Sequence, residues 1–234
     1  VRTGSLPLDA RVPRTIPPAM SEPGAAAPGG ARTGMLSRVA AVAALSFSSG
    51  LPLGLVWIAI PDWMRSIGVD IRVVGLFTLA QAPWSFKFLW SPLMDRFRLP
   101  FWGRRRGWIA VAQGALVLAG LALSGVGSRP ETPWVALAVT LAVALAGATQ
   151  DIAIDAYAVD VLRKEEHGVA VGLRMALYRA AMTLSGGLAI WAAASLGWGA
   201  VNVLLALSYV PLLLVTWRSP EPEEETAAPK TLRD

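Results

Sequence analysis

Four charged side chains stand out among those inside segments that are otherwise apolar, where charges are rare and usually functional. They are Lys87, Asp151, Asp155 and Arg179. The two aspartates are spaced i and i+4, which places them on one face of a helix. Two neighbouring carboxylates repel each other, and such a pair with little access to water is suited to binding a proton. The spacing therefore predicts a proton-binding site; the alternative is that both aspartates lie in water beside a helix end, as Asp160 is expected to do in the following loop.

The basic residues of these segments are candidate partners for the aspartates. The depth of Lys87 fits two readings equally: its side chain extends to the lipid headgroups, or it faces a polar cavity between helices. A buried arginine needs a carboxylate, so Arg179 is expected to pair with Asp151 or Asp155, or to receive an anionic group of a substrate. Arg174 lies closer to the segment end and is expected to reach the headgroups.

A dense group of charges separates two of the apolar segments. Asp95 and Arg96 are followed by Arg104, Arg105 and Arg106, and then directly by another apolar run. Placing an arginine at the centre of a membrane helix costs roughly 2.5 to 3.5 kcal/mol on insertion scales. The three consecutive arginines therefore predict a tight turn on the cytoplasmic side of a membrane.

The composition is that of an integral membrane protein. Of the 234 residues, 54% are hydrophobic and 16% are charged, which is too apolar for an ordinary soluble domain. The formal charge of +5 does not indicate nucleic-acid binding, because the basic residues fall between apolar segments and not on one folded face. The chain has no cysteine, which excludes disulfides and thiolate sites. The single histidine, His167, lies in a charged loop, and neither a metal nor a cofactor is expected.

Six apolar segments are each close to the roughly 20 residues that cross a bilayer. They predict an all-α membrane protein with a bundle of six transmembrane helices, at residues 39–60, 73–90, 108–126, 134–158, 169–195 and 198–217. Pro52 and Pro83 lie inside the first two segments and predict kinks in those helices. The tryptophans near segment ends are expected to lie in the interfacial belt: Trp63, Trp90, Trp108, Trp134, Trp198 and Trp217.

The basic residues also predict the orientation of the bundle. Of the 21 lysines and arginines, 18 fall on one side, and the other side has only Arg65, Arg72 and Arg129. The positive-inside rule then predicts that both termini are cytoplasmic. Residues 1–34, rich in Pro, Ala, Gly and Arg, are expected to form a disordered cytoplasmic tail, residues 35–217 the bundle, and residues 218–234 an acidic cytoplasmic linker. The true start could lie at Met20 or Met35.

Four separated motifs resemble the major facilitator superfamily, in particular its branch of AmpG-like muropeptide permeases and acetyl-coenzyme A transporters. The motifs are SSGLP (48–52), KFLWSPLMDR (87–96) with GRRRGW (103–108), QDIAIDAY (150–157) and YRAAMTLSGGLA (178–189). The loop departs from the family pattern in two ways, since Ser91 stands where a glycine is usual and the spacing from Arg96 to Gly103 is longer. The resemblance favours a position for Lys87 in a polar cavity.

The resemblance implies a bacterial inner-membrane permease of twelve helices in two halves, of which this chain supplies the N-terminal six. It implies proton-coupled uptake of a muropeptide or another polar anionic solute by alternating access. The implied partners are the bilayer, protons, the solute and a second six-helix half. Two groups of residues are assigned: a substrate and proton pathway of Lys87, Asp151, Asp155, Tyr178 and Arg179, and a cytoplasmic gate of Asp95, Arg96, Arg104, Arg105 and Arg106.

Two other readings remain open. The chain could be a half-transporter that works as a homodimer or with a separately encoded half. It could also be a membrane-embedded hydrolase with a nucleophile at Ser48 or Ser49, but that chemistry needs a base on another helix, and the only histidine lies in a loop. An intramembrane aspartyl protease needs its carboxylates on different helices, whereas Asp151 and Asp155 share one. The sequence therefore predicts a transporter and not an enzyme.

Overall fold

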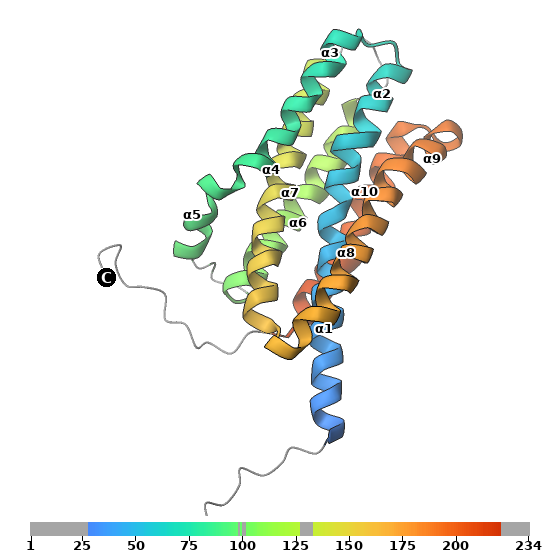
Figure 1. Cartoon of the computed structure of the whole chain (residues 1–234). Helices are drawn as coiled ribbons and strands as arrows, with labels where there is room; N and C mark the ends of the chain where they lie inside the picture. Colours follow the sequence, from blue (N-terminus) through green and yellow to red (C-terminus); the bar gives the residue numbers. More distant parts are fainter. Residues whose placement is uncertain (1–27, 98, 100–101, 127–132, 221–234) are drawn as a thin grey trace, which may run out of the picture.

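The computed structural model describes residues 28–97, 99, 102–126 and 133–220, and the regular elements within them are all helical. The helices join into six rods that run side by side (Figure 1). The first rod contains α1 (Pro28–Gly54), η1 (Leu55–Ala59) and α2 (Ile60–Ser66). The second contains α3 (Ile71–Leu76), η2 (Phe77–Gln81), α4 (Ala82–Phe86), η3 (Lys87–Leu89) and α5 (Ser91–Arg96). The third and fourth are α6 (Arg104–Val126) and α7 (Pro133–Val161). After η4 (Lys164–Glu166), the fifth contains α8 (His167–Thr183), η5 (Leu184–Leu188) and α9 (Ala189–Leu196), and the sixth is α10 (Trp198–Arg218).

The six rods confirm the predicted all-α architecture and match the six predicted segments in order. Among the described residues, four stretches are long and apolar enough to cross a bilayer: Gly34–Ser66, Arg104–Val126, Pro133–Val161 and Trp198–Arg218. The second rod is divided into short helices and the fifth carries Arg174 and Arg179 among its apolar residues, so neither meets that standard. The fold therefore has between four and six spans.

The first helix begins earlier than predicted. α1 starts at Pro28, inside the predicted disordered tail 1–34 and ahead of the predicted segment start at residue 39. A proline is tolerated in the first turn of a helix because its missing N–H would have no partner there. Residues 1–27 of the predicted tail and 221–234 of the predicted linker lie outside the described residues.

Both prolines at which kinks were predicted lie close to a change of helix type. Pro52 lies inside α1, two residues before the α-helix gives way to the π-helix η1. Because Pro52 has no N–H, the carbonyl of Ser48 loses its usual helical donor. The hydroxyl of Tyr209, on α10, donates to that carbonyl at 3.5 Å. Pro83 lies in the first turn of α4, directly after the 3-10 helix η2.

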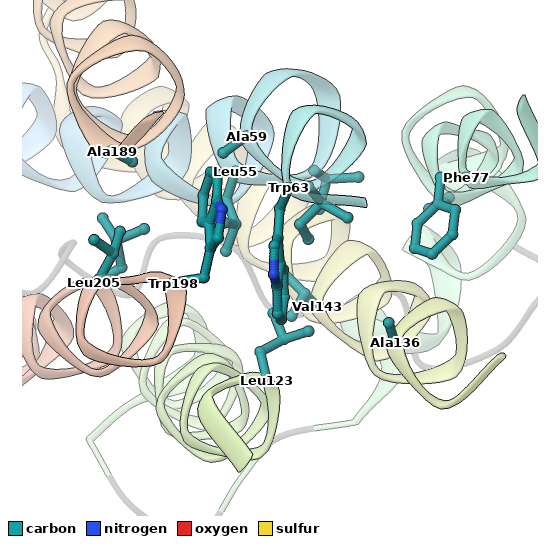
Figure 2. Close-up of a cluster of buried hydrophobic side chains, with 14 of the residues drawn as sticks. Leu55, Ala59, Trp63, Phe77, Leu123, Ala136, Val143, Ala189, Trp198 and Leu205 are labelled. Carbon is teal, nitrogen blue, oxygen red and sulfur yellow. The ribbon is translucent and has the colours of Figure 1, made fainter. Parts of the chain in front are cut away.

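Two tryptophans that were predicted to lie in the interfacial belt are instead part of the core. Trp63 and Trp198 stack with ring centroids 5.7 Å apart (Figure 2), and they are only 1% and 8% exposed. The connection from α9 to α10 is the single residue Gly197, at φ 79°, so Trp198 follows a turn that is too short to reach away from the bundle. Trp134 and Trp217 are exposed, in keeping with the belt prediction.

Two glycines of α1 allow α8 and η5 to pack unusually close to it. A Cβ added to Gly50 would lie 2.3 Å from the carbonyl oxygen of Tyr178, and one added to Gly54 would lie 2.3 Å from Ser185 Oγ. Such distances are far inside van der Waals contact, so only glycine fits at either position. This close packing fixes the position of α8 relative to α1.

We predict that Gly54→Ala destabilises the bundle, because the new methyl group would also lie 2.4 Å from the backbone oxygen of Met182. The expected loss is roughly 1 to 3 kcal/mol, which is typical of overpacking. Thermal unfolding in detergent micelles measures it. Gly187→Ala is the matched control, since a Cβ there meets nothing within 4 Å. A Gly54→Ala protein as stable as Gly187→Ala would contradict the packing argument.

Candidate functional site

Four charged side chains from three rods form one ion-pair cluster. The Lys87 ammonium lies between two carboxylates, 3.6 Å from Asp151 Oδ2 and 3.4 Å from Asp155 Oδ2. Arg174 Nη2 lies 2.6 Å from Asp155 Oδ1. When all four groups are ionised, two positive charges balance two negative charges. Charges within a membrane bundle are stabilised by pairing of this kind.

Local helix geometry brings these four groups together. Asp151 and Asp155 are one turn apart on α7, so they lie on the same face. Lys87 is the first residue of η3, where the second rod changes from an α-helix to a 3-10 helix. Arg174 lies on α8, which the contact at Gly50 holds against α1.

Two serines of α1 complete the cluster. Ser49 donates a hydrogen bond to Asp151 Oδ1. Arg174 Nε donates to Ser46 Oγ at 3.0 Å, and Ser46 in turn donates to the carbonyl of Val42 at 2.8 Å. Both serines are buried. They position one acidic and one basic member of the cluster.

The two carboxylates differ in their access to solvent. The side chain of Asp151 is 13% exposed, whereas that of Asp155 is 55% exposed. Beside them is a pocket of about 300 Å³ whose polar lining comes from Ser46, Ser49, Asp151, Asp155, Arg174 and Tyr178. The reading in which the aspartates merely flank a helix end in water does not describe Asp151. Asp151 is therefore the more buried carboxylate and Asp155 the more exposed one.

The structure corrects the predicted pairing of the arginines. Arg174, which was expected to reach the headgroups, pairs with Asp155. Arg179 is exposed and, among the described residues, its side chain has no ion-pair or hydrogen-bond partner. The reason is helix rotation, because Arg174 and Tyr178 are spaced i and i+4 and face the pocket, whereas Arg179 lies about 100° further round α8.

The sequence analysis missed Ser46, Ser49 and Arg174 as members of the site. Arg174 carried a usable signal, since it lies four residues before Tyr178 and thus on the same helical face. Ser49 was considered only within the SSGLP motif and as a candidate nucleophile, and not as a partner of Asp151. No sequence signal distinguishes Ser46 from a serine that bonds to its own helix, which it also does.

A second ion-pair group connects α5, α6 and α7 at the end of the bundle. Asp95 Oδ1 lies 3.5 Å from Arg104 Nη2 and 2.6 Å from Arg105 Nη1. Arg105 Nε lies 2.8 Å from Asp160 Oδ2. Asp160 belongs to the last turn of α7, and not to a loop as predicted. Arg105 therefore bridges two carboxylates from two rods.

Two arginines of the predicted gate have other positions. Arg96 is exposed, and its side chain has no polar partner in the described part of the chain. Arg106 Nη1 donates to the carbonyls of Trp217 and Ser219, at 3.1 and 2.8 Å. These carbonyls are at the end of α10, where a helix leaves its last acceptors unpaired. Arg106 therefore caps α10 and makes no ion pair with Asp95.

A buried hydrogen-bond network lies next to Ser49 and Asp151. Gln113 and Gln150 both donate to Ser48 Oγ, at 3.1 and 2.6 Å, and Thr216 donates to Gln113 Oε1 at 2.8 Å. These four side chains come from α1, α6, α7 and α10. Ser48 Oγ is thus bonded to two amides, and within the described residues no base is bonded to it.

Glu166 fixes the loop between α7 and α8 to α1. Its carboxylate pairs with the Arg38 guanidinium and also accepts the backbone N–H of Arg163 at 3.0 Å. The hydrogen bonds from Arg38 hold the pKa of Glu166 below its ordinary value of 4.5.

Among the described residues, no three histidine, aspartate or glutamate side chains are grouped so that they could hold a metal ion.

Comparison with known proteins agrees with this architecture. A family model described as Major Facilitator Superfamily matches residues 42–234. The chain belongs to the major facilitator superfamily. The superfamily consists of membrane transporters and not of enzymes, so the hydrolase reading is set aside.

Individual members of the superfamily support the predicted AmpG-like branch. The chain is 40% identical over 196 residues to the anhydromuropeptide permease of Escherichia coli, and the aligned region covers 83% of this chain and 40% of that protein. It is 34% identical over 170 residues to an uncharacterized protein of Haemophilus influenzae, with 73% and 40% covered. It is 32% identical over 171 residues to the putative transporter AmpG 4 of Rickettsia felis, with 70% and 41% covered. The chain therefore spans about two fifths of the length of these relatives.

The Arg38–Glu166 pair predicts a specific pH dependence of stability. The lowered pKa of Glu166 means that the pair stabilises the folded state fully above about pH 4.5, and that this stabilisation is lost as the pH falls further. Glu166→Gln should therefore lower the unfolding midpoint at pH 7, and the difference from the wild type should shrink below pH 4.5. Thermal unfolding of both proteins across pH 3.5–7 checks this. A difference that stays constant over this range would show that the charge of Glu166 has no part in stability.

Proposed function

We propose that this chain is the N-terminal half of a proton-coupled permease that takes up a muropeptide or another polar anionic solute by alternating access. The observation that carries the proposal is the balanced ion-pair cluster beside a pocket within the bundle. The 40% identity to an anhydromuropeptide permease supports the choice of solute. A second six-helix half, on the same chain, on a separate chain or in a second copy of this one, would complete the path between the two sides.

The same proposal places the chain in a bacterial inner membrane with both termini in the cytoplasm. The support is the position of the arginine cluster relative to the termini. The start of α1 and the end of α10 lie at the same end of the bundle (Figure 1). Arg106, in the first turn of α6, contacts the end of α10. The arginines 104–106 therefore lie at the same end as both termini of the bundle, as the positive-inside rule requires of a cytoplasmic end.

We assign proton binding to Asp151, the less exposed of the two carboxylates in the cluster. A proton on Asp151 would remove one of the two negative charges that face Lys87. Lys87 and Arg174 would then share Asp155 alone, and the cluster would carry one excess positive charge. An anionic solute can balance that charge, so binding of the proton favours binding of the solute.

The ion pairs of Asp95 are proposed to act as the cytoplasmic gate. They join the ends of α5 and α6, and Arg105 extends the connection to Asp160 on α7. Because α7 also lines the pocket, a change in these pairs can move one wall of the pocket. Exposed pairs of this kind contribute little to stability, in general about 0 to 1 kcal/mol each. A contact of that strength can bias two conformations without locking either one.

For the coupling role, we predict that Asp151→Asn in the complete permease abolishes solute accumulation driven by a proton gradient. Exchange of labelled for unlabelled solute at equal pH should persist, because it requires no net proton movement. Uptake into proteoliposomes measures both. The matched control is Asp62→Asn on α2, which is exposed and lies outside the cluster. Gradient-driven uptake that survives Asp151→Asn would remove Asp151 from the coupling mechanism.

For the gate, we predict that Asp95→Asn shifts the permease toward the state that is open to the cytoplasm, because Arg104 and Arg105 lose a shared carboxylate. Labelling of a cysteine introduced at the pocket residue Met175 by a membrane-impermeant thiol reagent, added from the cytoplasmic side, reports this opening. The labelling rate should rise relative to the same cysteine in an Asp62→Asn background. Equal labelling rates, together with an unchanged transport rate, would refute the gate assignment.

A further inference from the structure

The pocket beside the ion-pair cluster lies between α1, α7 and α8. Its volume of about 300 Å³ is at the lower end of the range for small-molecule sites, which is roughly 300 to 1,000 Å³. A whole muropeptide, with its sugars and peptide, is larger than this. The pocket therefore suits one functional group or one residue of a larger solute.

Arg174 uses only part of its guanidinium within the protein. Nε donates to Ser46 and Nη2 donates to Asp155. In the part of the chain that the structure describes, Nη1 has no hydrogen-bond acceptor. A guanidinium is a planar fork of five N–H donors that matches the geometry of a carboxylate or phosphate. Nη1 of Arg174 can therefore donate hydrogen bonds to a second anionic group while Nη2 stays bonded to Asp155.

Tyr178 supplies a second unused donor in the same pocket. It lies one turn after Arg174 on α8 and lines the pocket with it. Its hydroxyl has no hydrogen-bond partner among the described residues. A partly buried tyrosine hydroxyl usually finds such a partner, so this hydroxyl is available to a bound molecule.

The acidic side of the pocket is already occupied by protein groups. Asp151 accepts a hydrogen bond from the Ser49 hydroxyl and forms an ion pair with Lys87. Asp155 forms ion pairs with both Lys87 and Arg174. A cationic ligand would have to displace these contacts. An anionic ligand would meet unused donors instead, and the ligand class that fits the pocket is therefore an anion.

We propose that Arg174 Nη1 and the Tyr178 hydroxyl form a subsite that binds a carboxylate of the transported solute. The identity of the solute rests on the function proposed above, whereas the subsite rests on the pocket itself. The exposed Arg179 lies on a different face of α8, so it would not contact the bound carboxylate directly.

The test is a binding measurement on the complete permease in detergent, by isothermal titration calorimetry, with three probes. The first is an anhydromuropeptide with free carboxylates, the second is the same molecule with its carboxylates converted to amides, and the third is glucuronate, a small sugar acid. Tyr178→Phe is the informative variant, because it removes only one hydroxyl. Leu173→Met, at an exposed position of α8 outside the pocket lining, is the matched control.

We expect the wild type to bind the free acid more tightly than the amide. Tyr178→Phe should weaken binding of the free acid by roughly tenfold or more, as for the loss of one hydrogen bond to a charged group, and should leave binding of the amide unchanged. Leu173→Met should change neither affinity.

The outcomes separate this inference from the proposed function. If both muropeptide forms bind equally and Tyr178→Phe affects them equally, the subsite is overturned while muropeptide binding stands. If neither muropeptide form binds, but glucuronate binds and Tyr178→Phe weakens it, the subsite stands and the proposed solute is overturned. If none of the three probes binds, the subsite is overturned.

Discussion

Pairing of charges within an apolar bundle is the constraint on which the rest of this structure depends. A charge removed from water is destabilising unless a counter-charge and hydrogen bonds replace its hydration. Here α7 supplies both acids, so the basic residues must come from the rods on either side of it, Lys87 from η3 and Arg174 from α8. The hydroxyls of Ser46 and Ser49 on α1 provide part of the remaining hydrogen bonds.

Small residues set the distances at which that pairing is possible. Gly50 and Gly54 allow α8 and η5 to approach the backbone of α1. A Cβ at Gly147, on α7, would lie 3.0 Å from both Pro52 and Trp84, so this glycine brings α7 against α1 and α4 in turn. The acidic helix and the basic helix are therefore both positioned by contact with the first rod. Such close helix packing at small residues is usual in membrane proteins, where burial of apolar side chains provides little driving force.

Features that depend on one-dimensional pattern could be predicted from the sequence. The six apolar runs follow from bilayer thickness, and Lys87, Asp151 and Asp155 were identifiable because charges are rare in such runs. Features that depend on the rotation or tilt of a rod were not predictable. The spacing of Arg174 and Tyr178 showed that they share a face of α8, but not that this face is turned toward Asp155, and that rotation decides between Arg174 and Arg179 as the partner of Asp155.

Burial of side chains at rod ends also escaped the sequence analysis. A tryptophan at a segment end has the same local sequence whether it faces lipid or a neighbouring helix. Trp63 and Trp198 became core residues because the one-residue connection at Gly197 brings the start of α10 against α2. Likewise, nothing in the sequence distinguished Arg106, which caps α10, from the adjacent Arg105, which pairs with Asp95 and Asp160.

The cap that Arg106 forms on α10 has a mechanical consequence. Ser219 is held through its carbonyl by Arg106, and Pro220 accepts a hydrogen bond from the Tyr157 hydroxyl at 2.7 Å. The carbonyls of Ser219 and Pro220, just after α10, are thus bonded to the ends of α6 and α7. A tilt of α6 that separates Arg105 from Asp95 would therefore also move the end of α10.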